Sequence, residues 1–150
     1  ADGDAYHDGH LYATAWTGAT ATGKAAALVM ATRLIDAEFQ FNGVRAIVGQ
    51  ALAWPRRVCP YPDTGDMLAF NAIPKPVVEA ACELARELLI ADRTAAPAGE
   101  GLSYQNIGST QTGYNKTDTR PIIPAVVQAM LSKYGSLVKA KSGSVRLVRV

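Results

Sequence analysis

The chain has 150 residues, of which 49% are hydrophobic and 19% are charged, and its formal net charge is only +2. This length and composition predict one domain with enough apolar material for a core. No apolar run reaches the length of a membrane span and no basic-then-apolar signal segment opens the chain. We therefore expect neither a membrane-spanning nor a secreted protein.

The first part of the chain carries a weak helical pattern and then a strong one. Residues 2–12 predict a short helix, and residues 16–18 predict a break after it. Between residues 22 and 39 apolar side chains recur at three- and four-residue steps, which is the spacing of one helical face. Thr20 or Thr22 is placed to cap this helix.

A tryptophan–proline pair, Trp54 and Pro55, lies in the connection that follows. Proline pushes the residue before it toward extended backbone, so a helix cannot continue here. The apolar content around the pair is too high for a solvated loop. We interpret residues 50–57 as a wedge between the flanking helices. The side chains expected in the groove are Ala51, Leu52 and Trp54, and those expected on the surface are Arg56 and Arg57. The predicted structural core signature is Leu52, Trp54 and Pro55.

Two prolines open the remaining helices. Pro74 precedes the clearest helix, which has a wide apolar stripe and is expected to end around Arg93. Pro124 precedes a short final helix that is expected to stop at Gly135. Between these helices residues 102–115 alternate loosely around a Gly-Ser pair, which predicts a β-hairpin.

The charges are unevenly distributed. Through Asp118 there are nine Lys/Arg and thirteen Asp/Glu, whereas residues 119–150 contain six basic residues and no acidic one. Such a basic segment suits an anionic partner, either nucleic acid or an acidic protein surface. Residues 145–150 look like a strand with no local partner, which favours pairing with another chain. The residues predicted to bind the partner are Lys139, Lys141, Val145, Arg146, Leu147, Val148, Arg149 and Val150.

Motifs for catalysis and metal binding are weak. Residues 18–24 match the first part of a phosphate-binding loop, but Ala25 stands where Ser or Thr would hold Mg²⁺. His7 and His10 can share a helix face, yet a metal site requires three or four converging ligands. We therefore expect no enzyme, no cofactor and no metal.

The cysteines and the paired carboxylates are expected to be structural or solvated. Cys59 falls in a loop and Cys82 in a helical pattern, and without a secretory signal we expect two free thiols. The carboxylate pairs lie near turns and are expected to face water; they are Asp36 with Glu38 and Asp63 with Asp66.

The order and spacing of several segments resemble a family of tailed-phage proteins. The matching segments are AALVMATRLID at residues 26–36, QALAWPR at 50–56, Ile73-Pro74 followed by VVEAACELA at 77–85, Asp92-Arg93, Ile107-Gly108-Ser109 and Pro121-Ile-Ile-Pro124. Members of this family are described either as DnaT-like single-stranded-DNA-binding proteins or as head–tail connector (adaptor) proteins. The resemblance spans residues 2–134 and is least typical beyond them.

Similarity to head–tail adaptors implies a ring, usually of twelve copies, below the portal in the phage neck. Such a ring is part of the virion, is assembled in the bacterial host cytoplasm, and extends the DNA channel. The implied partners are the portal protein, a downstream neck or tail protein (stopper, tail tube or terminator), identical subunits, and duplex DNA that passes without sequence-specific binding. The residues themselves predict a mainly α fold: a small helical bundle with long structured loops, a small β-hairpin and an extended C-terminal arm. Residues 1–134 would form the body and residues 135–150 the arm.

Three other functions stay open at this point. The DnaT-like description implies single-strand binding in replication, but no run of exposed aromatic and basic residues is apparent over the body, and we place Trp54 in the core. A P-loop enzyme would depend on Lys24. A stopper or tail terminator would favour a β-rich fold, which the helical periodicity argues against.

Overall fold

The computed structural model describes residues 2–95, 104–113 and 120–138. Within these ranges the chain is helix-rich, with five helices and three pairs of short antiparallel strands. The helices are α1 (Asp2–Asp8), α2 (Thr14–Thr17), α3 (Ala21–Glu38), α4 (Lys75–Ile90) and α5 (Ala125–Leu131). The strands are β1 (Phe39–Phe41), β2 (Val44–Arg45), β3 (Arg56–Arg57), β4 (Tyr104–Ile107), β5 (Thr110–Gly113) and β6 (Gly135–Leu137). None of the helices in these ranges is long and apolar enough to cross a membrane.

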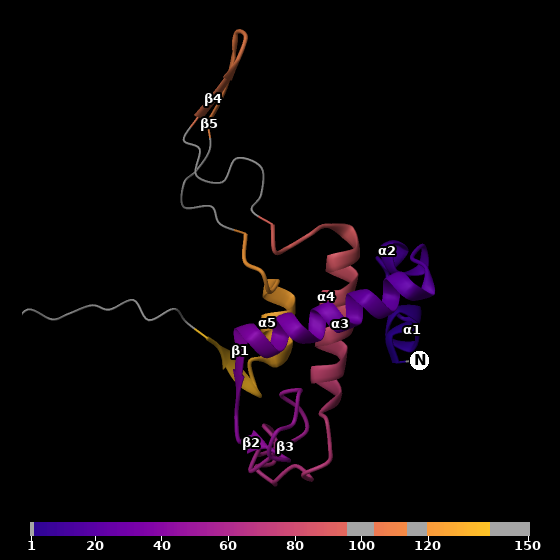
Figure 1. Cartoon of the computed structure of the whole chain (residues 1–150), viewed down its shortest axis with the longest axis vertical. Helices are drawn as coiled ribbons and strands as arrows, with labels where there is room; N and C mark the ends of the chain where they lie inside the picture. The colour runs from indigo at the N-terminus through magenta and orange to yellow at the C-terminus, as the bar shows by residue number, and fades with distance from the viewer. Residues whose placement is uncertain (1, 96–103, 114–119, 139–150) are drawn as a thin grey trace, which may run out of the picture.

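The core forms where α3 crosses α4 (Figure 1). The buried positions on the two helices include small residues: Ala31 of α3 and Ala80 and Ala85 of α4 are fully buried. Small side chains at a crossing allow the helix axes to approach closely. α5 also packs on α4 and contributes Val127 and Leu131, both fully buried. These three helices make up the body that the apolar stripes predict.

The beginnings of the long helices are as the sequence predicts. The Thr20 side chain accepts a hydrogen bond from the backbone N–H of Gly23 at 3.1 Å, so Thr20 is the cap of α3. α4 and α5 begin directly after Pro74 and Pro124.

The two proline-started helices end earlier than predicted. α4 ends at Ile90 and α5 at Leu131. Arg93, which was expected near the end of α4, contacts the segment that precedes α5. Its guanidinium donates to the carbonyl oxygens of Ile122 at 3.1 Å and Pro121 at 3.0 Å. This pair of hydrogen bonds holds the chain in place where it enters α5.

The N-terminal prediction is wrong in its boundaries. The expected helix over residues 2–12 ends at Asp8, and the expected break at Trp16 is instead the short helix α2. The physical reason is burial of Trp16, which is 2% exposed and donates its indole N–H to Asp4 at 3.0 Å. Gly3 makes room for this ring, because a Cβ there would lie 2.7 Å from a Trp16 ring carbon.

The predicted hairpin is confirmed, and the start of the predicted arm takes part in the fold. β4 pairs antiparallel with β5, and Gly108 at the turn has a φ of 61°, which suits glycine. Figure 1 shows this hairpin set apart from the helices. β6 pairs antiparallel with β1, so residues 135–137 belong to a strand pair. The rest of the expected arm, residues 139–150, lies outside the described residues.

Candidate assembly surface

The connection between β1 and α4 is a structured set of loops. β2 pairs with β3, which puts Val44 opposite Arg57, and an isolated bridge joins Pro60 to Met67. Gly43 lies so close to this pairing that a Cβ there would overlap the carbonyl oxygen of Arg57. The loops are therefore held to each other by backbone contacts as well as by the core beneath them.

Arg56 fixes these loops to the end of β1. Its guanidinium donates to four backbone carbonyl oxygens, which are those of Asn42 at 2.7 Å, Gly43 at 2.7 Å, Ala53 at 3.0 Å and Phe41 at 3.2 Å. Partial burial lowers the pKa of Arg56 from its usual value. The sequence places Arg56 on the surface, whereas the structure uses it as a cross-link between loop segments; only Arg57 is exposed as predicted.

Trp54 lies beneath the loops as predicted. It is 6% exposed and meets Phe41 edge to face, with ring centroids 5.4 Å apart. Leu52 is not the buried core residue that was predicted, because it is 51% exposed and Ala53, the next residue, is buried in its place. Ala51, which was expected in the groove with it, is also exposed. Pro55 is partly buried, and its carbonyl accepts from the backbone N–H of Ala46 at 3.1 Å. The wedge therefore consists of Ala53 and Trp54.

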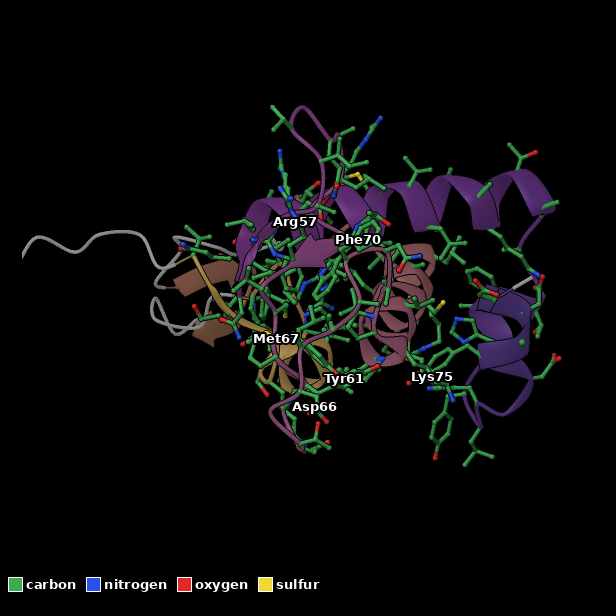
Figure 2. The ribbon with its side chains drawn as sticks, turned by 90° about the horizontal axis from the view of Figure 1, so that it is seen from below. Arg57, Tyr61, Asp66, Met67, Phe70 and Lys75 are labelled. Carbon is green, nitrogen blue, oxygen red and sulfur yellow. The ribbon has the colours of Figure 1, made fainter. Side chains whose placement is uncertain are left out.

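Large apolar side chains cover the outer side of the same loops. The exposed residues are Val44, Ile47, Val48, Val58, Tyr61, Met67 and Phe70. We call the part of this surface that carries Tyr61, Met67 and Phe70 the loop face. Val48 is 97% exposed and Phe70 64%. Figure 2 shows Tyr61, Met67 and Phe70 on the loops that lie below the helices in Figure 1. Concentrations of exposed apolar residues of this kind mark sites of protein–protein or ligand interaction.

Charged side chains are interspersed with the apolar ones. Arg57 is exposed beside Phe70 in Figure 2, and Lys75 at the start of α4 lies near the same loops. Asp66 lies among them, Lys75 is ion-paired with Glu79 at 3.3 Å, and Asp63 is ion-paired with Lys133 at 2.8 Å. The loop face is therefore mainly apolar, with charges of both signs around it. The sequence shows no sign of this face, because its residues are brought together by the β2–β3 pairing and the Pro60–Met67 bridge.

The weak catalytic and metal motifs acquire other partners. The segment before residues 18–24 is the helix α2, where a phosphate-binding loop would need a strand. Lys24 is ion-paired with Asp4 at 2.8 Å. His7 is buried and its Nε2–H lies 3.2 Å from the carbonyl oxygen of Cys82, while His10 lies 3.3 Å from Glu83. Within the described ranges no group of three potential metal ligands converges.

The cysteines are free, as predicted. Cys59 and Cys82 are both buried and unpaired. Burial raises the pKa of Cys82 to about 11, so the thiol is neutral and unreactive at physiological pH. Of the acidic pairs, Asp36 departs from the expectation of a solvated carboxylate, because it accepts from the backbone N–H of Ala53 at 2.8 Å.

A family model described as "Putative DnaT-like ssDNA binding protein" matches residues 1–150. This description is that of a binding protein and names no catalytic activity. No curated protein and no solved structure matches the chain.

Proposed function

The chain belongs to the family described as "Putative DnaT-like ssDNA binding protein", and within it we propose that this member is a structural head–tail adaptor of a tailed phage. In this role, copies of the chain form a ring below the portal in the phage neck and join the capsid to the tail. The observation that carries the proposal is the loop face, which exposes large apolar side chains on a structured part of the body.

The chemistry of the loop face favours a protein partner over a nucleic acid. Apolar contacts supply most of the driving force for protein association. A phosphate backbone requires several converging cations. The exposed cations on and near these loops are Arg45, Arg57 and Lys75; Asp66 lies among them, and Lys75 is ion-paired with Glu79 at 3.3 Å. The basic residues 139–150 would add a second contact, to an acidic portal surface or to a neighbouring subunit.

The adaptor proposal is tested by particle assembly. A chain that carries Met67→Glu and Phe70→Glu should fold normally but fail to enter particles, because two charges on the loop face oppose its burial. The matched control is Val29→Glu on α3, which is 52% exposed and lies outside the loop face. Deletion of residues 139–150 should leave a folded body that no longer joins the portal. Normal incorporation of both altered chains would contradict the proposal.

Copy number gives an independent check. A mass measurement should show that the isolated protein is a monomer or a small oligomer, whereas each purified neck should contain many copies of it. A protein that is absent from purified particles is not an adaptor.

Single-stranded-DNA binding is a second candidate, which the family description favours. The structural feature that would serve it is the pair of exposed aromatic residues Tyr61 and Phe70, with Arg57 and Lys75 nearby (Figure 2). Stacking on such rings contributes about 1–3 kcal/mol per base. This candidate predicts tight, salt-sensitive binding of a labelled oligonucleotide by the isolated protein, and loss of that binding when Tyr61 and Phe70 are replaced by alanine. The adaptor proposal predicts no such binding.

A further inference from the structure

A groove with a cavity volume of about 620 Å³ lies between α1, α3 and α4. Its apolar lining comes from α3, from the connection before α4 and from α4 itself; the main contributors are Leu28, Ile35, Leu52, Ile73, Val77 and Val78. The groove is therefore distinct from the loop face, and it is large enough to take several side chains of another segment.

One side of the groove holds a buried donor that lacks an acceptor. Trp54 lines the groove and is 6% exposed, and its indole N–H has no hydrogen-bond partner among the described residues. Trp16, which also lines the groove, is different because its N–H donates to Asp4 at 3.0 Å. Buried indole N–H groups are usually paired. An occupant of the groove that offers an acceptor, such as a peptide carbonyl, would supply the partner that this donor lacks.

The charged residues of the lining select a cationic occupant. They are Asp2, Asp4 and Asp36 on the acidic side and Lys24 on the basic side. Lys24 is already ion-paired with Asp4 at 2.8 Å. The lining therefore carries an excess of negative charge around an apolar floor, which suits a segment that combines apolar and basic side chains.

We propose that this groove binds residues 139–150 of a neighbouring copy of the chain. This segment contains four basic residues and no acidic one, and it ends in Val145-Arg-Leu-Val-Arg-Val150. Six residues in extended form span about 20 Å, and every extended residue presents a carbonyl that can accept from Trp54. The valines and the leucine fill the apolar floor while Arg146 and Arg149 reach Asp2 and Asp36.

The tail and the groove lie at different places on the chain, which determines the kind of contact that they make. The chain leaves the described body at Val138, whose N–H donates to Glu38 at the end of α3 at 2.8 Å. The groove lies farther back along α3, between Ala21 and Asp36. A contact between two different surfaces is head-to-tail, and its repetition closes into a ring when the rotation allows. The inference rests on the proposed function in that it supplies the subunit contact of the adaptor ring.

The test is complementation between two full-length variants. The groove variant is Leu52→Arg, because Leu52 lines the groove and is exposed enough to accept the change without unfolding. The tail variant is Arg146→Glu with Arg149→Glu. Sedimentation over a range of high micromolar concentrations should show weak self-association of the unaltered chain. The association constant should be about tenfold lower for each variant alone. The control Leu11→Arg, at an 84% exposed position outside the groove, should behave as the unaltered chain.

Mixing the two variants decides the matter. The groove variant still has a normal tail and the tail variant still has a normal groove, so an equimolar mixture should form a heterodimer that neither protein forms alone. Misfolding cannot produce this gain. A mixture that stays monomeric overturns the inference. Docking of the tail on the groove of its own chain also overturns it, and would appear as a shift of tryptophan fluorescence on Arg146→Glu that does not depend on protein concentration. The adaptor proposal would survive that result if the protein were still found in particles.

Discussion

The indole ring of Trp54 meets the phenol ring of Tyr134 edge to face, with ring centroids 6.2 Å apart and ring planes at 81°. Trp54 comes from the connection before α4, and Tyr134 comes from the turn between α5 and β6. Phe41 of β1 also packs on Trp54, with ring centroids 5.4 Å apart. These aromatic rings therefore join β1, the loops and the last described strand in one cluster beneath the loop face.

We expect Trp54→Ala to lower the free energy of unfolding by about 3–5 kcal/mol, because it removes a large buried ring from this cluster. Leu52→Ala is the matched control and should cost less than about 1 kcal/mol, since half of the leucine side chain is already in water. Urea unfolding followed by circular dichroism measures both changes. Equal costs for the two substitutions would show that Trp54 does not hold the cluster together.

A second prediction concerns the cross-link made by Arg56. Lysine carries the same charge but cannot donate to four carbonyl groups in a planar arrangement. Arg56→Lys should therefore destabilise the chain by about 2 kcal/mol, whereas Arg57→Lys at the exposed neighbouring position should change stability by less than about 0.5 kcal/mol. Hydrogen exchange should also become faster in the β2–β3 loops of the Arg56 variant alone. Unchanged hydrogen exchange in these loops would show that Arg56 does not hold them in place.

The sequence predicted those elements whose signals are local. The helical periodicity, the Thr20 cap and the prolines before α4 and α5 depend on neighbouring residues, and these helices begin where they were expected. The hairpin around Gly108 follows from an equally short pattern. The burial of Trp54 could be predicted because tryptophan is rarely exposed.

The rest depends on contacts between distant segments. Trp16 looks like part of a break, but its hydrogen bond to Asp4 creates α2 instead. Arg56 looks like a surface residue because its four acceptors come from segments that lie beside it only after folding. The loop face and the groove were missed for the same reason. A signal for the groove was present only in the alternation of small and large residues along α3 and α4, which gives a packing surface and does not show where it stays uncovered.

Stability should fall as the pH is lowered below about 6.5, the usual pKa of histidine. Burial lowers the pKa of His7 in the folded chain, so the unfolded chain binds a proton first and stability declines as the pH falls through this region. Neighbouring groups keep their charge states there: the pKa of Glu83 is lowered in spite of its burial because Arg86 donates to it, and burial beside Glu83 raises the pKa of Tyr6 to about 12.

The pH effect is isolated by comparing two variants. The other histidine, His10, lies in the same part of the fold, 3.3 Å from Glu83. The measurement is therefore made in a His10→Gln background, as the urea midpoint between pH 7.5 and pH 5.5, with and without His7→Gln; both limits are chosen to lie about one unit on either side of the histidine pKa. The chain that retains His7 should lose more stability. Parallel pH profiles would mean that His7 is not the group responsible.

The last prediction concerns the strand pair from which residues 139–150 emerge. A Cβ on Gly135 would lie 2.5 Å from the carbonyl oxygen of Gln40 and 2.8 Å from the Cα of Phe41, both of them backbone atoms that cannot move aside easily. Gly135→Ala should therefore separate β6 from β1 and destabilise the chain by about 1–3 kcal/mol. Gly113→Ala is the control, because a Cβ there meets no atom within 4 Å. The Gly135 variant should also enter particles less efficiently, since its tail would no longer start from a fixed point beside Glu38. Full stability together with full incorporation would show that β6 can yield without consequence for either the fold or the assembly.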